Sequence, residues 1–186
     1  MPEETARYTI RPSAESTFTL EVSKTGLMAG KKHFLFFEQY AGELDYNSQH
    51  PENSSLRLTV EASSVTCKDA WIKDKSKRKQ VVETAVNHMM AARQYPQLTF
   101  SSTRITPRSK GQFEIQGDLT VRGVTKPIRF VAAAKPSGIE RLEMDGDAEI
   151  DLKDYGLRPP SAALGLIGTR AKMTLRFLVW AEKAKS

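Results

Sequence analysis

The sequence has few of the features that mark membrane-spanning or disulfide-bonded proteins. Its longest apolar runs, such as residues 130–134, are far shorter than the roughly 20 residues that a membrane-spanning helix needs. The single cysteine, Cys67, excludes a disulfide within the chain and any multi-cysteine metal site, which fits a reducing compartment. Residues 1–4 carry two glutamates where an export signal has basic residues, and no apolar segment of a signal peptide follows them. We therefore expect a cytoplasmic protein, or a periplasmic one if a leader has been removed.

Motifs for catalysis and cofactor binding are also missing. The three histidines, His33, His50 and His88, have no ligand-type spacing, and glycine-rich nucleotide loops do not occur. The carboxylates at residues 145–154 mostly alternate along one strand, which is typical of a solvated face. We interpret Cys67 as a half-buried thiol at a strand end rather than as a nucleophile. We therefore predict no enzyme activity, no catalytic residue, no cofactor and no metal site.

What the sequence does have is the length and composition of one globular domain. It comprises 186 residues, of which 39% are hydrophobic and 27% are charged. These values are ordinary for a globular protein, and the length lies within the usual range of one domain. We expect a single domain over residues 1–186.

Alternation of apolar and polar residues dominates the chain and predicts an all-β fold. It occurs at residues 18–22, 56–62, 98–101, 113–121, 128–130, 148–152 and 171–179, and an aromatic run at 34–37 adds a further strand. About eight antiparallel strands with one apolar face form either a sandwich or a barrel. The strands expected at 33–46 and 111–121 are longer than usual, which favours an extended eight-stranded, lipocalin-like barrel.

The phase of each strand predicts which side chains face the interior. These positions are candidates for contact with a ligand, although each can equally serve plain core packing. They are Phe18, Leu20, Leu58, Phe100, Phe113, Ile115, Leu119, Phe130, Ile150, Met173, Leu175 and Phe177.

One segment breaks the alternation and predicts an amphipathic helix at about residues 76–92. It lies within a basic stretch, residues 68–93, where seven basic and three acidic residues account for +4 of the chain's net charge of +6. Four basic residues fall at the start of the helix, where the helix dipole disfavours them: Lys75, Lys77, Arg78 and Lys79. The helix either binds a polyanion or lipid headgroups, or it presents a solvated face and covers one barrel end.

Two sequence motifs resemble those of the YceI-like family of polyisoprenoid-binding proteins. They are residues 95–103, Tyr-Pro-Gln-Leu-Thr-Phe-Ser-Ser-Thr, and residues 117–128, Gly-Asp-Leu-Thr-Val-Arg-Gly-Val-Thr-Lys-Pro-Ile. Weaker matches at 42–46, 62–65 and 152–157 extend the resemblance over nearly the whole chain. The resemblance implies a lipocalin-like barrel whose apolar tunnel holds a long isoprenoid or another amphiphile, without catalysis.

The sequence also departs from the family pattern in its opening strand and in one loop. Arg11, Glu15 and Lys24 stand where many members have Asp, His and His, and the basic stretch at 68–93 replaces the family's Arg-Asp-x-His-Leu loop. The resemblance therefore bears on the fold more directly than on the identity of the ligand.

Three functional hypotheses follow. The first is a lipid-binding barrel that carries or sequesters a long apolar ligand, such as a polyisoprenoid, an isoprenoid quinone or a fatty-acid-like amphiphile. The alternative is an interaction or stress-protection module with a filled barrel, whose basic helix binds a partner protein or polyanion. A hydrolase or isomerase that uses the carboxylates near Asp151 is the least favoured. The expected partners are an apolar small molecule and an anionic membrane surface rather than nucleic acid, and a homodimer stays open.

Overall fold

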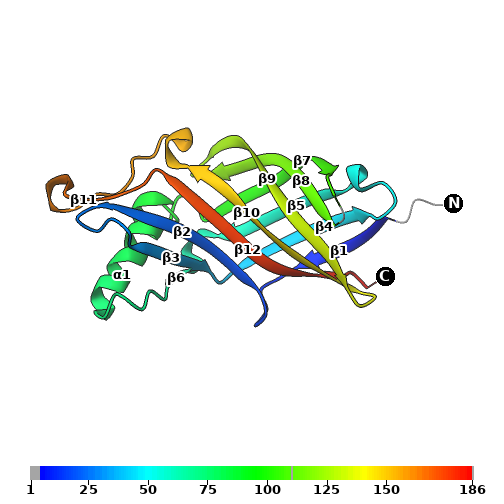
Figure 1. Cartoon of the computed structure of the whole chain (residues 1–186), viewed down its shortest axis with the longest axis horizontal. Coiled ribbons are helices and arrows are strands. Elements are labelled where there is room, and N and C mark those ends of the chain that lie inside the picture. Colours follow the sequence, from blue (N-terminus) through cyan, green and yellow to red (C-terminus); the bar gives the residue numbers. More distant parts are fainter. Residues whose placement is uncertain (1–4, 110, 186) are drawn as a thin grey trace.

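The alternating segments form antiparallel strands that close into a long barrel, with a helix at one end (Figure 1). The computed structural model describes residues 5–109 and 111–185. Residues 1–4, on which the expected lack of an export leader rests, lie outside the described part. The predicted eight-stranded antiparallel barrel with one helix is confirmed.

The strands follow one another along the chain with few other elements between them. They are β1 (Thr5–Ile10), β2 (Thr17–Gly26), β3 (Lys32–Phe37), β4 (Tyr40–Asn47), β5 (Ser55–Glu61), β6 (Val65–Cys67), β7 (Gln97–Pro107), β8 (Gln112–Val121), β9 (Val124–Ser137), β10 (Arg141–Asp151), β11 (Ile167–Thr169) and β12 (Lys172–Lys183). Single 3-10 turns lie at Pro51–Asn53, Ala62–Ser64, Leu152–Tyr155 and Ala163–Gly165. The helix, α1, spans Lys75–Glu83.

Three of the eight barrel strands are interrupted, so each of these three consists of two consecutive segments. β1 and β2 both pair with β12, β4 pairs with β1 and β5, and β3 pairs with β2 and β6. Each of the pairs β1–β2, β3–β4 and β5–β6 thus acts as one bent strand. β7, β8, β9, β10 and β12 complete the ring, and Tyr8 opposite Lys183 closes it.

The strand expected at residues 33–46 is therefore broken rather than continuous. β3 ends at Phe37 and β4 begins at Tyr40, opposite the 3-10 turn that separates β5 from β6. Hydrogen bonds from Glu38 N to Ser64 O (3.2 Å) and from Glu61 N to Gln39 O (3.0 Å) bridge this irregular point. The two adjacent interruptions bend both strands together, so their pairing survives.

The barrel wall is incomplete at one end, where β6 pairs with no second strand in the part of the chain that the structure describes. β5 pairs with β7, but β6 pairs only with β3, so the sheet parts between β6 and β7. The connection between these strands contains α1, which lies over this end of the barrel in Figure 1. The helix thus serves as the wall and cover where the sheet is missing.

The helix differs in detail from the expected span of 76–92. It begins one residue earlier, at Lys75, and its last turns widen to π geometry over Thr84–Met89. It ends there because Ala91 adopts a left-handed conformation, with φ of 48°. Asp74 accepts a hydrogen bond from Ser76 N (2.8 Å), which places a negative charge beside the basic first turn. No helix among the described residues is long and apolar enough to cross a membrane.

The two motifs that carried the family resemblance lie against each other in the fold. Arg122 and Gly123, both with positive φ, make the tight turn between β8 and β9. A Cβ atom at Gly123 would lie 2.9 Å from Cε1 of Tyr95, so the tyrosine ring packs onto the glycine backbone. Their role is structural, because they fix the start of β7 against the β8–β9 turn.

Candidate functional site

The barrel interior holds a large cavity beneath the helix. Its volume is about 1110 Å³, slightly above the 300–1,000 Å³ that is usual for small-molecule sites. Side chains from β2, β3, β5, β7, β8, β9, β10 and β12 form its wall, and α1 and the following π turns form its cover. The deep part of the wall is almost wholly aliphatic and aromatic.

Ten of the twelve side chains predicted to face a ligand line this cavity. They are Phe18, Leu20, Leu58, Phe100, Leu119, Phe130, Ile150, Met173, Leu175 and Phe177. The structure thus brings them together around one space, as the strand phases predicted. Whether they contact a ligand stays a prediction.

Phe113 and Ile115 point inward but lie beyond the floor of the cavity. On β8, Gly117 separates them from Leu119, and the ring of Phe100 lies across this glycine so closely that a side chain there would collide with it. Phe130 packs against Phe100, with ring centroids 5.6 Å apart. Neither residue lines the cavity. Ile115 packs in the same core cluster as Phe100, and Phe113 contacts Tyr46.

Several residues that line the cavity were not among the twelve predicted positions. The helix and its π turns contribute their apolar face, and a loop and the sheet add further side chains: Val81, Ala85, Met89, Met90, Ile72 and Met144. The helix residues carried a detectable signal, since their periodicity predicted an apolar face turned toward the barrel. The contribution of Ile72 depends on how the loop after β6 folds back, which no local pattern indicates.

Polar residues lie at the helix end of the cavity, which forms its mouth. Lys24, Lys73 and Lys77 contribute to this rim together with Asp74 and Glu83, and none of the three lysines makes an ion pair with a described carboxylate. Burial lowers the pKa of Lys24 below that of a free lysine. Its Nζ lies 3.5 Å from Thr169 Oγ1. The mouth is therefore polar, with three lysines and two carboxylates, whereas the floor is apolar.

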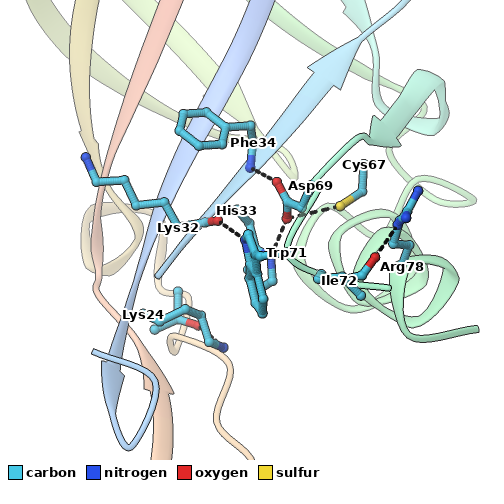
Figure 2. A network of polar contacts seen from close by, with 10 residues as sticks. Lys24, Lys32, His33, Phe34, Cys67, Asp69, Trp71, Ile72 and Arg78 are labelled. Atoms are coloured by element: carbon cyan, nitrogen blue, oxygen red, sulfur yellow. Dashed lines mark hydrogen bonds and ion pairs between the residues drawn. The ribbon is translucent and has the colours of Figure 1, made fainter. Parts of the chain in front are cut away.

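A buried polar cluster lies in the wall beside this mouth (Figure 2). His33 Nδ1 lies 2.8 Å from Asp69 Oδ2, and Cys67 Sγ donates to the same oxygen at 3.2 Å. Asp69 Oδ1 accepts a hydrogen bond from Phe34 N at 2.9 Å. Burial is the main cause that raises the pKa of the Cys67 thiol. Cys67 is half-buried at the end of β6, in the position that its sequence indicated.

The grouping of this cluster was not visible in the sequence. His33 is the second residue of β3, Cys67 ends β6 and Asp69 follows it, so more than thirty residues separate the histidine from the other two. They meet because β3 and β6 pair, with Leu35 opposite Cys67.

Comparison with known proteins assigns the same fold. The model of the YceI-like domain matches residues 8–179. A UPF0312 protein of Vibrio cholerae serotype O1 is 30% identical over 132 residues, which cover 68% of this chain and 66% of that protein. This match spans just under two thirds of the relative's length. A UPF0312 protein of Shewanella baltica is 28% identical over 166 residues, covering 85% of this chain and 80% of the relative.

Solved structures agree at much lower identity. BcnA of Burkholderia cenocepacia superposes with a TM-score of 0.69 at 17% identity, covering 90% of this chain and 96% of BcnA. A polyisoprenoid binding domain from Saccharophagus degradans, implicated in plant cell wall breakdown, gives 0.67 at 12% identity, covering 97% and 100% of the two chains. At these identities the likeness concerns the fold alone.

Proposed function

Because this chain belongs to the YceI-like family, we propose that it binds one long apolar molecule inside its barrel and carries or sequesters it. The observation that supports this most is the cavity of about 1110 Å³ with an apolar floor. A barrel whose own side chains filled the interior would leave no such space. The cavity therefore favours a carrier over the alternative of a filled interaction module.

The polarity of the cavity suggests the class of ligand. A molecule that lies along the cavity has its tail among Phe100, Phe130 and Leu119, and its other end at the polar mouth beside Lys24. Burial of apolar surface stabilises the complex by about 0.8 kcal/mol for each methylene. An amphiphile with a long hydrocarbon chain and a small head group that accepts hydrogen bonds fits both ends. A polyisoprenoid, an isoprenoid quinone and a fatty-acid-like molecule all belong to this class, and the Saccharophagus neighbour is described as polyisoprenoid binding.

The rim of the mouth also suits contact with an anionic membrane, from which such a ligand can be taken. Leu27, Leu164 and Leu166 lie together there, joined by a hydrogen bond from Leu27 N to Leu166 O (3.0 Å), and they are 75%, 106% and 59% exposed. Ala163 and Leu164 both have positive φ, an uncommon conformation that holds the leucine out in solvent. Lys24, Lys73 and Lys77 line the cavity, and α1, which carries Lys77, lies at this end of the barrel (Figure 1). Apolar tips among basic residues are typical of surfaces that insert into anionic lipid.

Binding of a neutral polyprenol to delipidated protein tests the proposed ligand class. We expect one molecule per barrel, with an affinity that changes little between low and high salt, because burial of an uncharged chain is not screened. A protein that takes up neither the polyprenol nor a long-chain fatty amide would contradict the proposal.

The membrane contact is tested separately by sedimentation with phosphatidylcholine vesicles that contain or lack phosphatidylglycerol. Changing Leu27, Leu164 and Leu166 together to Ser should weaken binding to the anionic vesicles and leave polyprenol uptake intact. Ile139→Ser is the matched control, because Ile139 is 93% exposed in the β9–β10 turn at the other end of the barrel. Equal loss in the control would show that exposed apolar residues act without regard to position.

A further inference from the structure

The wall beside the mouth contains three side chains of the types that bind transition metals. The donor atoms of His33, Cys67 and Asp69 all lie within 4.8 Å of one another. Asp69 Oδ2 is 2.8 Å from His33 Nδ1 and 3.2 Å from Cys67 Sγ, so one carboxylate oxygen holds the other two donors beside it (Figure 2). A nitrogen, a sulfur and an oxygen thus converge on one point from two strands and a loop.

The fold holds each of these donors in place. Asp69 is fixed through its other oxygen, which accepts a hydrogen bond from Phe34 N at 2.9 Å. The ring of His33 stacks on Trp71, with centroids 5.2 Å apart and an angle of 28° between the ring planes. Trp71 is fixed in turn by a hydrogen bond from Nε1 to Lys32 O at 2.8 Å. Such supporting contacts orient ligands in metal sites and raise their affinity.

Burial protects the cluster from competition by water. The side chain of Asp69 is completely buried, and that of His33 is 11% exposed. No lysine or arginine makes an ion pair with Asp69 among the described residues, and His33 beside it carries a charge only if it is protonated. Beside a neutral His33, a bound cation would supply the countercharge of this buried carboxylate.

We infer that His33, Cys67 and Asp69 form a binding site for a divalent transition metal ion of the zinc class. Imidazole and thiolate ligands select zinc and similar borderline-soft ions, whereas calcium and magnesium prefer sites made only of oxygen. Three protein ligands leave one of the four zinc positions for water or for an oxygen atom from the cavity, because His33 also lines that space.

Zinc binding requires the three donor atoms to reach similar separations from one another. Around a tetrahedral zinc ion with bonds of about 2.0–2.3 Å, neighbouring ligand atoms lie roughly 3.3–3.8 Å apart. The separations of 2.8 and 3.2 Å from Asp69 Oδ2 must therefore widen by a few tenths of an ångström. The histidine nitrogen and Cys67 Sγ, which lie within 4.8 Å of each other, must settle in the same range. The ion replaces the hydrogens that now lie between the donors. The thiol releases its proton to solvent, and a neutral imidazole carries its proton on Nε2 so that Nδ1 binds the metal.

Cobalt(II) tests this inference directly, because it enters zinc sites and absorbs light when a thiolate binds it. Cys67 is the only cysteine in the chain, so a thiolate-to-cobalt charge-transfer band can come only from this cluster. Titration of the reduced, full-length protein should give this band with a stoichiometry of one, and zinc should displace it. Absence of the band at saturating cobalt would overturn the inference.

Zinc affinity of single variants supplies a second test. Cys67→Ser keeps a hydroxyl that can donate to Asp69, and Asp69→Asn keeps the shape of the side chain, so both preserve much of the packing. Each should lower zinc affinity at least a hundredfold in competition with a chromophoric chelator, and thermal unfolding of the metal-free variants checks that they fold. His50→Gln is the control, because the His50 ring pairs with Glu52 at the surface and with no other described carboxylate. If that control lowers the affinity as much, or if both cluster variants bind zinc normally, the metal lies elsewhere and the inference fails.

Discussion

The substitution Leu119→Trp tests the cavity as a ligand site through the length of chain that it admits. Leu119 is 7% exposed, lines the cavity and lies opposite Phe100 on the neighbouring strand, next to the floor. An indole at this position extends into open space above the floor, so it shortens the cavity. Its cost in stability should fall at the lower end of the roughly 1–3 kcal/mol that overpacking usually causes.

The loss of affinity can be estimated from the methylenes that the indole displaces. If it excludes about three of them, at about 0.8 kcal/mol each, the affinity for a long chain falls by roughly fiftyfold. A chain that is too short to reach the floor should bind the variant as well as it binds the wild type. The substitution therefore predicts a change in chain-length preference rather than a uniform loss.

Displacement of a fluorescent fatty acyl probe by n-alcohols of increasing length measures this preference. In the wild type, the affinity should rise about fourfold with each methylene until the cavity is filled. In Leu119→Trp the rise should stop at a shorter chain. Phe113→Trp is the control, because Phe113 lies on the same strand but behind the floor. The reasoning is refuted if Leu119→Trp folds and binds the longest alcohols normally.

Three further predictions concern the basic helix, a family motif and a buried tyrosine. Vesicle sedimentation should show that salt-sensitive binding to anionic lipid is lost, and polyprenol uptake kept, when four basic residues become Glu: Lys75, Lys77, Arg78 and Lys79. Gly123→Ala should lower the thermal midpoint more than Gly138→Ala, because both glycines have φ of 75° but only the first meets Tyr95; equal shifts would contradict this packing. Burial raises the pKa of Tyr155 to about 12, so the folded state keeps its proton longer than the unfolded state. Stability should therefore fall as the pH rises from about 10 to 12, and Tyr155→Phe should flatten that fall in denaturant titrations; an unchanged slope would refute it.

Which side chains face the barrel interior could be predicted from the sequence, because alternation along a strand is a local property. Leu119, Ile115 and Phe113 share one phase, and all three point inward. Their depth could not be predicted, since the floor depends on the ring of Phe100 crossing Gly117 from the neighbouring strand. The position of a residue along the barrel is a consequence of tertiary packing, whereas the face on which it lies is not.

Non-local pairing explains what the sequence did not reveal about the polar cluster. His33 and Cys67 belong to strands that are adjacent only in the folded sheet, so their spacing in the chain resembles no metal motif. The end of the helix was missed for a different reason. Its apolar periodicity continues past Met89, but the chain turns at Ala91 through a left-handed conformation that periodicity does not report.

Mass spectrometry of the protein as purified tests the carrier function most directly. Native spectra compare the mass of the folded protein with that of the denatured chain, and an organic extract identifies what was released. The proposed function predicts one lipid-soluble molecule with a long hydrocarbon chain per barrel, displaced when a polyprenol is added. A native mass equal to that of the bare chain, which no polyprenol, quinone or fatty amide changes, would contradict it.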